Sequence, residues 1–196
     1  KAYESKGVVL AVNYQRRWDV EMQRIKQSIR SGEFGTIQKV VVYYTKGICH
    51  NGSHAVDLIL DWLGYPDSIQ SLASHVDFLA EDPTVDAHLV FDDTHVYLLG
   101  LDEGQYSIFE IDVLGTLLRV KITKSGHATE WYTRQDDRRT SGHSRLYPLG
   151  VERPTELSQA MVRALAEIVD AMSNGKQIRS SGATATETLR LCHQLA

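Results

Sequence analysis

The sequence predicts an α+β fold, in which one large, open and mostly antiparallel β-sheet carries helices packed on one of its faces. Two observations carry this prediction. Six strand-like segments follow one another between residues 68 and 133 with only short links, and strands joined in this way pair antiparallel, because parallel strands need a long crossover. Helical patterns precede and follow that run of strands. A length of 196 residues with 42% apolar content suits one sizeable domain, residues 1–196.

The first third of the chain alternates strand and helix patterns. Gly7–Asn13 is a continuous apolar run, typical of a strand buried on both faces. Residues 19–31 repeat apolar side chains between polar ones, as an amphipathic helix does, and Gly32 ends that helix. Residues 36–45 are rich in Val and Tyr and predict a second strand. Residues 54–63 predict a helix that Gly64 and Pro66 stop.

The remainder of the chain predicts the sheet and two closing helices. The six strand-like segments are residues 68–76, 87–91, 94–101, 106–113, 117–123 and 127–133. Residues 134–152 are polar and predict an irregular, mobile loop. A helix is predicted over 155–172, with Leu157, Met161, Leu165, Ile168 and Met172 on one face. A final helix is predicted over 183–195, introduced by Ser180-Ser181-Gly182.

Composition limits the classes of partner. The net charge is −4 and no basic stripe is present, which argues against a nucleic-acid partner. No apolar run approaches the roughly 20 residues that cross a bilayer, and the polar first residues do not resemble a signal peptide. We therefore expect a cytoplasmic protein without a membrane partner, in which Cys49 and Cys192 are reduced thiols. Since the chain does not begin with Met, we also expect a piece cut from a longer protein.

The stretch from Lys46 to Asp57 holds the candidate chemistry. A strand ends near Lys46, a glycine turn follows, and a helix is expected to begin near Asn51, a good N-cap residue. His54 then lies in the first helical turn, with Asp57 on the same side three residues later. Asp57 could hold one imidazole nitrogen and leave the other free to move a proton, for which a side chain with a pKa of about 6.5 is suited.

Two other interpretations of His54 remain open. It could be a buried histidine that only helps to cap the helix. It could also ligate a metal, because His50, His54 and Asp57 offer two imidazoles and a carboxylate at helical spacing. Against a metal, His50 precedes the expected N-cap, and the Glu of a zinc-protease motif is absent. We therefore predict no metal site.

Two further polar segments are candidates for substrate contacts. Arg16 and Arg17 lie between Tyr14 and Trp18, and such a cluster could bind a carboxylate, a phosphate or a ring, or could simply pack Trp18 in the core. The polar stretch 134–152 could close over a polar substrate or remain a solvated loop. Its candidate contact residues are Arg134, Arg138, Arg139, His143, Arg145 and Tyr147.

The strand at residues 94–101 is apolar on both sides. Tyr97, Leu99 and Leu101 alternate with Val96 and Leu98, and helices can cover only one of these two faces. We expect the other face to form a homo-oligomer. The alternative is that the long polar loop shields it.

Taken in order, these segments resemble the C-terminal domain of the glucose–fructose oxidoreductase/inositol dehydrogenase/rhizopine-catabolism (Gfo/Idh/MocA) family. The family pattern begins with Tyr-x-Arg-Arg-aromatic and Gly-x-Ile/Phe-Gly, here Tyr14–Trp18 and Gly32–Gly35. It continues with Gly-Ser/Thr-His-x-x-Asp before a helix ending in Trp-Leu-Gly, here Gly52–Asp57 and Trp62–Gly64. Leu114-Gly115-Thr116 and the segment from Ser180 to Leu189 complete it. The order and spacing of these motifs carry the resemblance, which spans nearly the whole chain.

The resemblance implies an NAD(P)-dependent oxidoreductase that acts on a hydroxyl group of a sugar, polyol or nucleotide sugar. It implies that His54 is the catalytic histidine, that Lys46, His50 and Asn51 line the substrate pocket, and that the open sheet mediates oligomers. We add Arg16 and Asp57 as substrate-binding candidates. Family members often have Asp four residues before the histidine, where this chain has His50.

The resemblance also implies a second domain. Family members carry a Gly-x-Gly-x-x-Gly fingerprint and a Glu-Lys-Pro motif upstream, and this sequence contains neither. We therefore expect NAD or NADP to be bound by an N-terminal Rossmann domain outside this chain, and the chain alone to be inactive. The alternatives are an NAD-using glycosidase or epimerase, and a non-catalytic module for dimerisation or ligand binding.

Overall fold

A computed structural model describes residues 3–137 and 139–196 of the chain. Its centre is one mixed sheet, in which the strands follow the order β2-β3-β4-β1-β5-β6-β7-β8, while the short strand β9 also pairs with β7. The strands are β1 Ile37–Tyr44, β2 Ser68–Leu79, β3 Asp82–Phe91, β4 Thr94–Gly100, β5 Phe109–Gly115, β6 Leu118–Thr123, β7 Ala128–Asp136, β8 Ser144–Pro148 and β9 Arg153–Pro154. Every described pairing is antiparallel except that of β1 with β4. The predicted α+β class is confirmed.

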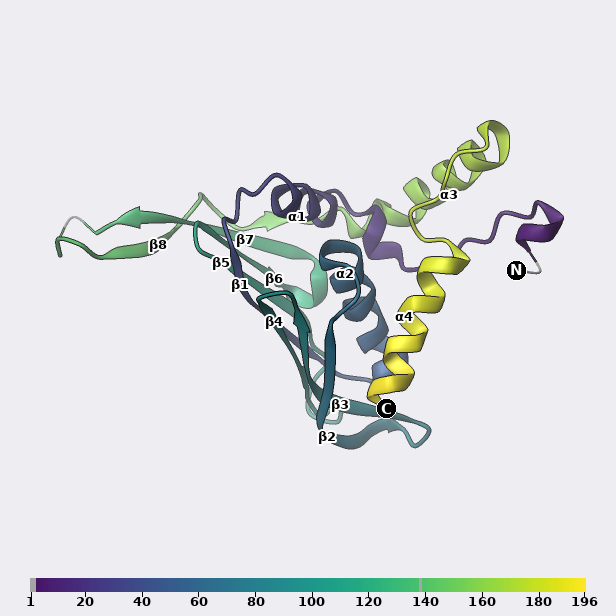
Figure 1. Cartoon of the computed structure of the whole chain (residues 1–196), viewed down its shortest axis with the longest axis horizontal. Coiled ribbons are helices and arrows are strands. Elements are labelled where there is room, and N and C mark those ends of the chain that lie inside the picture. The colour runs from purple at the N-terminus through teal and green to yellow at the C-terminus, as the bar shows by residue number, and fades with distance from the viewer. Residues whose placement is uncertain (1–2, 138) are drawn as a thin grey trace.

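Helices cover one face of this sheet. The helices α1 (Val20–Arg30), α2 (Ser53–Leu63) and α4 (Gly182–Leu195) lie on the same side, whereas α3 (Leu157–Asn174) extends beyond the sheet (Figure 1). The α1 helix begins where Asp19 accepts hydrogen bonds from the backbone N–H groups of Glu21 and Met22. Such an N-cap contributes about 1 kcal/mol to helix stability.

The core lies between the sheet and α1, α2 and α4. In β1, Val40, Val42 and Tyr44 alternate toward the helices and are buried. They meet the apolar side of α2, where Leu58 and Ile59 are fully buried. Burial of each such large side chain contributes about 1.5–3 kcal/mol. The alternation of apolar residues in β1 and their helical spacing in α2 bring these side chains together in the core.

The segment Gly7–Asn13 is not the predicted buried strand. Its one pairing within the described residues is an isolated bridge between Ala11 and Ser181. Val8, Val9 and Leu10 are 37–50% exposed. An apolar run becomes a two-sided strand only where other elements cover both of its faces, and the described chain provides none at this position.

Two further predictions are corrected. Residues 134–152 are not irregular throughout, because β7 continues to Asp136 and forms a hairpin with β8. The predicted apolar face of α3 is not buried as a unit. Alanines on α3 face the protein, whereas Met161, Leu165 and Met172 are 42–70% exposed.

The helices that the structure describes include none with the length and apolar character that a membrane span requires.

Candidate functional site

A tight turn joins β1 to α2 and sets the position of the candidate residues. Lys46 has a left-handed backbone (φ 68°), and residues Gly47–Gly52 form one turn of π-helix, η3, that runs directly into α2. Gly47 has φ +72°, and a Cβ there would lie 2.2 Å from a carboxylate oxygen of Asp82. That carboxylate accepts hydrogen bonds of 2.8 Å from the N–H groups of Cys49 and His50. Asp82 of β3, not Asn51, therefore caps this turn, and the predicted N-cap is wrong.

His54 lies in the first turn of α2, as predicted, and its ring is only partly buried. The ring packs edge-on against Tyr14, with the centroids 5.4 Å apart. Nδ1 is buried and has no hydrogen-bond partner among the described residues, whereas Nε2 is not buried. Burial, with the nearby Arg16 and His50, lowers the pKa of His54 to about 4. The imidazole is therefore neutral at pH 7.

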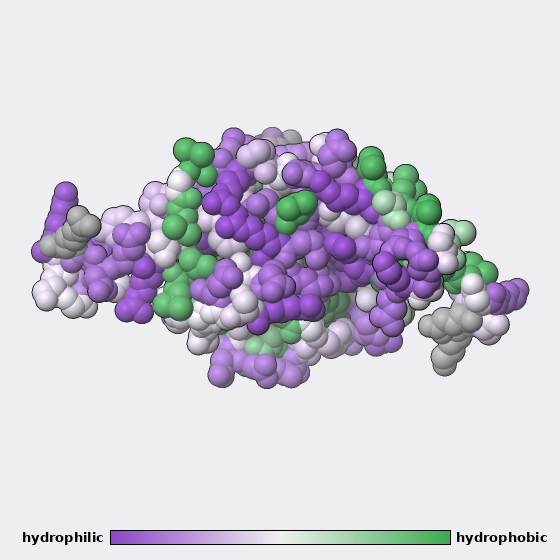
Figure 2. Space-filling model, turned by 90° about the horizontal axis from the view of Figure 1, so that it is seen from above, coloured by the Kyte–Doolittle hydropathy of each residue, from purple (hydrophilic) through white to green (hydrophobic). Residues whose placement is uncertain are grey.

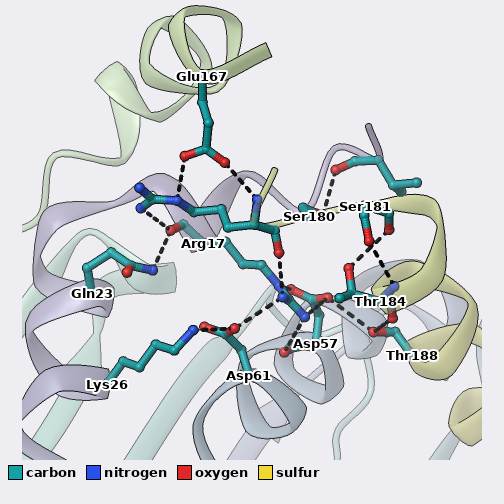
Figure 3. Close-up of polar contacts among 12 residues, drawn as sticks. Arg17, Gln23, Lys26, Asp57, Asp61, Glu167, Ser180, Ser181, Thr184 and Thr188 are labelled. Atoms are coloured by element: carbon teal, nitrogen blue, oxygen red, sulfur yellow. Dashed lines mark hydrogen bonds and ion pairs between the residues drawn. The ribbon is translucent and has the colours of Figure 1, made fainter. Parts of the chain in front are cut away.

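Asp57 does not hold the imidazole. Its two carboxylate oxygens accept hydrogen bonds from Nε (2.7 Å) and Nη2 (2.8 Å) of Arg17, and Thr188 donates a third at 3.1 Å (Figure 3). Arg17 also donates to Asp61 and to the carbonyl of Arg179. Asp57 is 1% exposed, so it belongs to a buried ion pair that joins α2 to η2 (Gln15–Trp18) and α4. Its predicted roles in holding His54 and in binding substrate are both corrected.

The three residues predicted to line the substrate pocket contact different parts of the protein. Lys46 forms a 2.9 Å ion pair with Glu103. The exposed ring of His50 packs against Phe78, with the centroids 5.5 Å apart. Asn51 donates a long hydrogen bond of 3.4 Å to the carbonyl of Ile108 and borders a cavity. Within residues 3–137 and 139–196, no group of three His, Cys, Asp or Glu side chains is arranged to hold a metal.

The cavity beside Asn51 has a volume of about 460 Å³. Arg16, which was also predicted to bind the substrate, lines it. The cavity lies where η2, the start of β5, the turn after β6 and the first turn of α3 meet. Its polar walls come from Gln15, Arg16, Asn51, Ser107, Ser125 and His127. Phe109, Leu157 and Met161 supply apolar surface, and Ser158 lines the side formed by α3.

Arg16 is the most unusual group in this cavity. It is only 9% exposed. Its guanidinium carbon lies 3.8 Å from the centroid of the Phe109 ring. Burial lowers its pKa to about 10, so it stays charged at pH 7. No carboxylate pairs with it among the described residues, and its buried Nε has no hydrogen-bond partner. The adjacent Arg17, by contrast, is fully paired.

The structure thus brings Arg16, Asn51 and His54 into one region. Arg16 is close enough to His54 to lower its pKa. Sequence reasoning missed the other polar walls, because Ser107, Ser125 and His127 belong to no motif and only the chain's path gathers them. The candidate loop residues are elsewhere: Arg134 and Arg145 border a different cavity, formed with Gln38 of β1, and Arg138 lies outside the described residues.

The fold of this chain is similar to that of solved structures described as oxidoreductases. No protein-family model matches the chain. A protein described only as uncharacterised, from Haemophilus influenzae, is 28% identical over 88 residues, which are 44% of this chain and 85% of that protein. A Desulfitobacterium hafniense structure assigned as an NADPH-dependent oxidoreductase superposes with a TM-score of 0.78 at 15% identity, over 97% of this chain and 62% of its own. The UDP-N-acetylglucosamine 3-dehydrogenase of Acidithiobacillus ferrooxidans superposes with a TM-score of 0.66 at 14% identity, over 98% of this chain and 62% of its own.

These comparisons establish a shared fold. The chain spans less than two thirds of the length of the solved structures that it resembles.

Proposed function

We propose that this chain is the substrate-side domain of an NAD(P)-dependent oxidoreductase of the Gfo/Idh/MocA type that oxidises a hydroxyl group of a sugar, a polyol or a nucleotide sugar. The observation that carries the proposal is His54, which lies in the first turn of α2 with Nε2 not buried, close enough to Arg16 of the cavity wall for that guanidinium to lower its pKa. The likeness of the fold to a sugar dehydrogenase supports the substrate class.

The proposed chemistry needs a base for the hydroxyl proton. Oxidation of an alcohol removes a proton from oxygen and a hydride from carbon, and the bound nicotinamide accepts the hydride. His54 takes the proton on Nε2. A neutral imidazole has one nitrogen with a free lone pair, and His54 accepts the proton on Nε2 in the tautomer whose own proton is on Nδ1. Asn51 and Arg16 orient the substrate from the cavity wall. Lys46 and His50 belong to the turn η3 that precedes His54.

The dinucleotide would be held by another domain. The chain has no glycine-rich Gly-x-Gly-x-x-Gly loop whose backbone N–H groups could bind the pyrophosphate. Its own residues therefore fit the substrate side of the reaction and not the cofactor side. In this proposal a Rossmann domain precedes the chain in the same polypeptide.

An apolar surface supports a docking partner at the same end of the molecule. The apolar residues of α3 and the N-terminal segment gather at one end (Figure 2). The exposed members are Val8, Val9, Leu10, Met161, Val162, Leu165, Val169 and Met172. A patch of this kind marks an interaction site in a stable protein. We assign it to the Rossmann domain, because it adjoins the cavity through Met161.

The outer face of the sheet is proposed to form a homo-oligomer. Tyr97 and Leu99 lie on the face away from the helices and are only partly buried, and Tyr97 stacks on His88 with the centroids 4.7 Å apart. Aromatic side chains on an open sheet favour protein contacts.

One observation favours a second function, a non-catalytic ligand-binding module. A general base works best when its pKa is near the working pH, and the pKa of His54 in this chain is about 4. If the chain is such a module, the cavity binds a ligand and His54 catalyses no reaction.

The deciding experiment uses the longer protein in which a dinucleotide-binding domain precedes this chain. Formation of NADH or NADPH is followed at 340 nm with sugars, inositols and nucleotide sugars. We expect turnover with at least one of these classes and a loss of kcat of about 10²–10⁴-fold in His54→Ala. Substrate binding without turnover supports the module, and full activity in His54→Ala rejects the assigned base.

A further inference from the structure

The cavity lined by Arg16 and Asn51 contains no acidic side chain. None of the described residues that line it is Asp or Glu, while Arg16 and His127 are both present. The remaining polar groups are amides and hydroxyls, which can donate hydrogen bonds. The lining therefore offers donors and positive charge, and nothing in it neutralises the guanidinium.

The guanidinium of Arg16 is held in place without being paired. The Phe109 ring covers one of its faces at 3.8 Å. Gly126, with φ +90°, lies close on another side, where a Cβ would come within 3.4 Å of Nε. Stacking leaves the N–H edge of a guanidinium free for the two parallel hydrogen bonds that it makes to a carboxylate or a phosphate. Asp19 is the one carboxylate whose charge acts on Arg16, but it forms no ion pair with the guanidinium. A buried charge without a direct partner is costly, and an anion in the cavity would reduce that cost.

A helix N-terminus faces the same cavity. Leu157 and Ser158, the first two residues of α3, line it. The N-cap residue Glu156 makes no capping hydrogen bond with its side chain, which pairs instead with Arg163. No acidic residue occupies the first turn. The first N–H groups of a helix have no partner within the helix, and its dipole favours a negative charge nearby.

We propose that the cavity is an oxyanion-binding site. Its substrate is then an anionic polyhydroxy compound, either a sugar acid or a sugar phosphate, and the guanidinium of Arg16 and the start of α3 hold the anion. The inference rests on the proposed function, since it gives the substrate class of that site, but it can be tested without turnover. Carboxylate and phosphate share the recognition chemistry, and the test separates them.

Anion binding would also act on the base. After burial, the charge of Arg16 is the next cause of the lowered pKa of His54. A carboxylate or phosphate on the guanidinium screens its charge, so the pKa of His54 rises toward the range in which an imidazole is an effective base. A neutral sugar in the same cavity would not have this effect.

The test measures binding to the full chain by calorimetry at low salt, with D-glucuronate, glucose 6-phosphate, D-glucose and inorganic phosphate as separate probes. We expect one of the two charged sugars to bind at least about tenfold more tightly than glucose, which corresponds to one charge-assisted hydrogen bond. The tighter of the two identifies carboxylate or phosphate as the anion. Equal affinity for the neutral and charged sugars overturns the proposal.

Variants at Arg16 link the effect to the cavity. Arg16→Met should remove the preference for the charged sugar, because it deletes the guanidinium. Arg16→Lys keeps the charge but loses the two-bond geometry, so an intermediate preference is expected and guards against a folding failure of the first variant. The control is Arg190→Gln on the exposed surface of α4, which should bind like wild type. An unchanged preference in both Arg16 variants overturns the proposal.

NMR titration of His54 gives a second readout. Saturation with the charged sugar that binds more tightly should raise the pKa of His54 in wild type and leave it unchanged in Arg16→Met. If the chain binds the charged sugar in this way but the full-length protein reduces no NAD(P)⁺ with any probe, the anion-binding site stands and the proposed oxidoreductase function is rejected. If the full-length protein turns over neutral sugars without any preference for anions, the proposed oxidoreductase function stands and the anion-binding site is rejected.

Discussion

Protonation of His54 should lower the stability of the folded chain as the pH falls from 7 to 5. Its pKa is about 4 in the folded chain, mainly because of burial, against an ordinary value of 6.5 in the unfolded chain. Between these values the unfolded chain binds a proton that the folded chain does not. The stabilisation is therefore complete above pH 6.5 and is lost progressively as the pH falls toward 4.

The magnitude follows from the two pKa values. The linkage relation gives a loss of about 2 kcal/mol between pH 7 and pH 5, approaching about 3 kcal/mol below pH 4. Asp57 acts in the opposite direction, because burial raises its pKa to about 6 and its protonation favours the folded state as the pH falls. The effect of His54 must therefore be read as a difference between wild type and variants that lack the imidazole.

Urea unfolding at pH 7, 6 and 5 provides that difference. His54→Gln and His54→Phe replace the imidazole by a polar and an apolar group, neither of which titrates. Both variants should gain about 2 kcal/mol relative to wild type on going from pH 7 to pH 5. A constant gap across this range in both variants would mean that the ring of His54 is solvated like a free histidine, and the argument for a buried neutral base would be lost.

Three further predictions concern the rest of the molecule. Arg17→Met should lower the free energy of unfolding in urea by about 3–5 kcal/mol, because it leaves Asp57 buried and unpaired; Arg17→Met with Asp57→Leu should recover most of that loss, and no recovery would show that the pair is not the cause. Tyr97→Glu should convert an oligomer into monomers in light scattering, since it places a charge on the outer face of the sheet; an unchanged mass would move the interface elsewhere. A thiol reagent at pH 8 should label Cys49 first and Cys192 only after unfolding, because burial raises the pKa of both thiols and Cys192 is fully buried; prompt labelling of Cys192 in the native chain would contradict its burial.

Local pattern predicted strands β1 to β7 and the helices that cover the sheet, but not β8 and β9. The alternation in β1, the 3.6-residue period of α1 and α2, and the glycine and proline stops depend on neighbours within a few residues. The placement of His54 in the first turn of α2 followed from the same local signals. The fold class and the location of the candidate base were therefore predictable without a structure.

Partner choice between distant segments was not predictable in this way. Asp57 is three residues from His54 along the helix, yet its carboxylate binds Arg17, 40 residues earlier in the chain. Asp82 of β3 took the capping role that the local pattern had assigned to Asn51. In each case a charged group pairs with whichever donor the tertiary packing brings within about 3 Å, and that distance is absent from local sequence.

Hydrophobic pattern by itself also does not say what covers an apolar face. Gly7–Asn13 and α3 have the composition of buried elements, but much of their apolar surface remains exposed in this chain. The sequence determined which segments are apolar, helical or extended, since those properties reside in consecutive residues. Only the tertiary structure decided that Arg17 forms a direct ion pair and Arg16 does not, because pairing depends on which carboxylates the fold places beside each guanidinium.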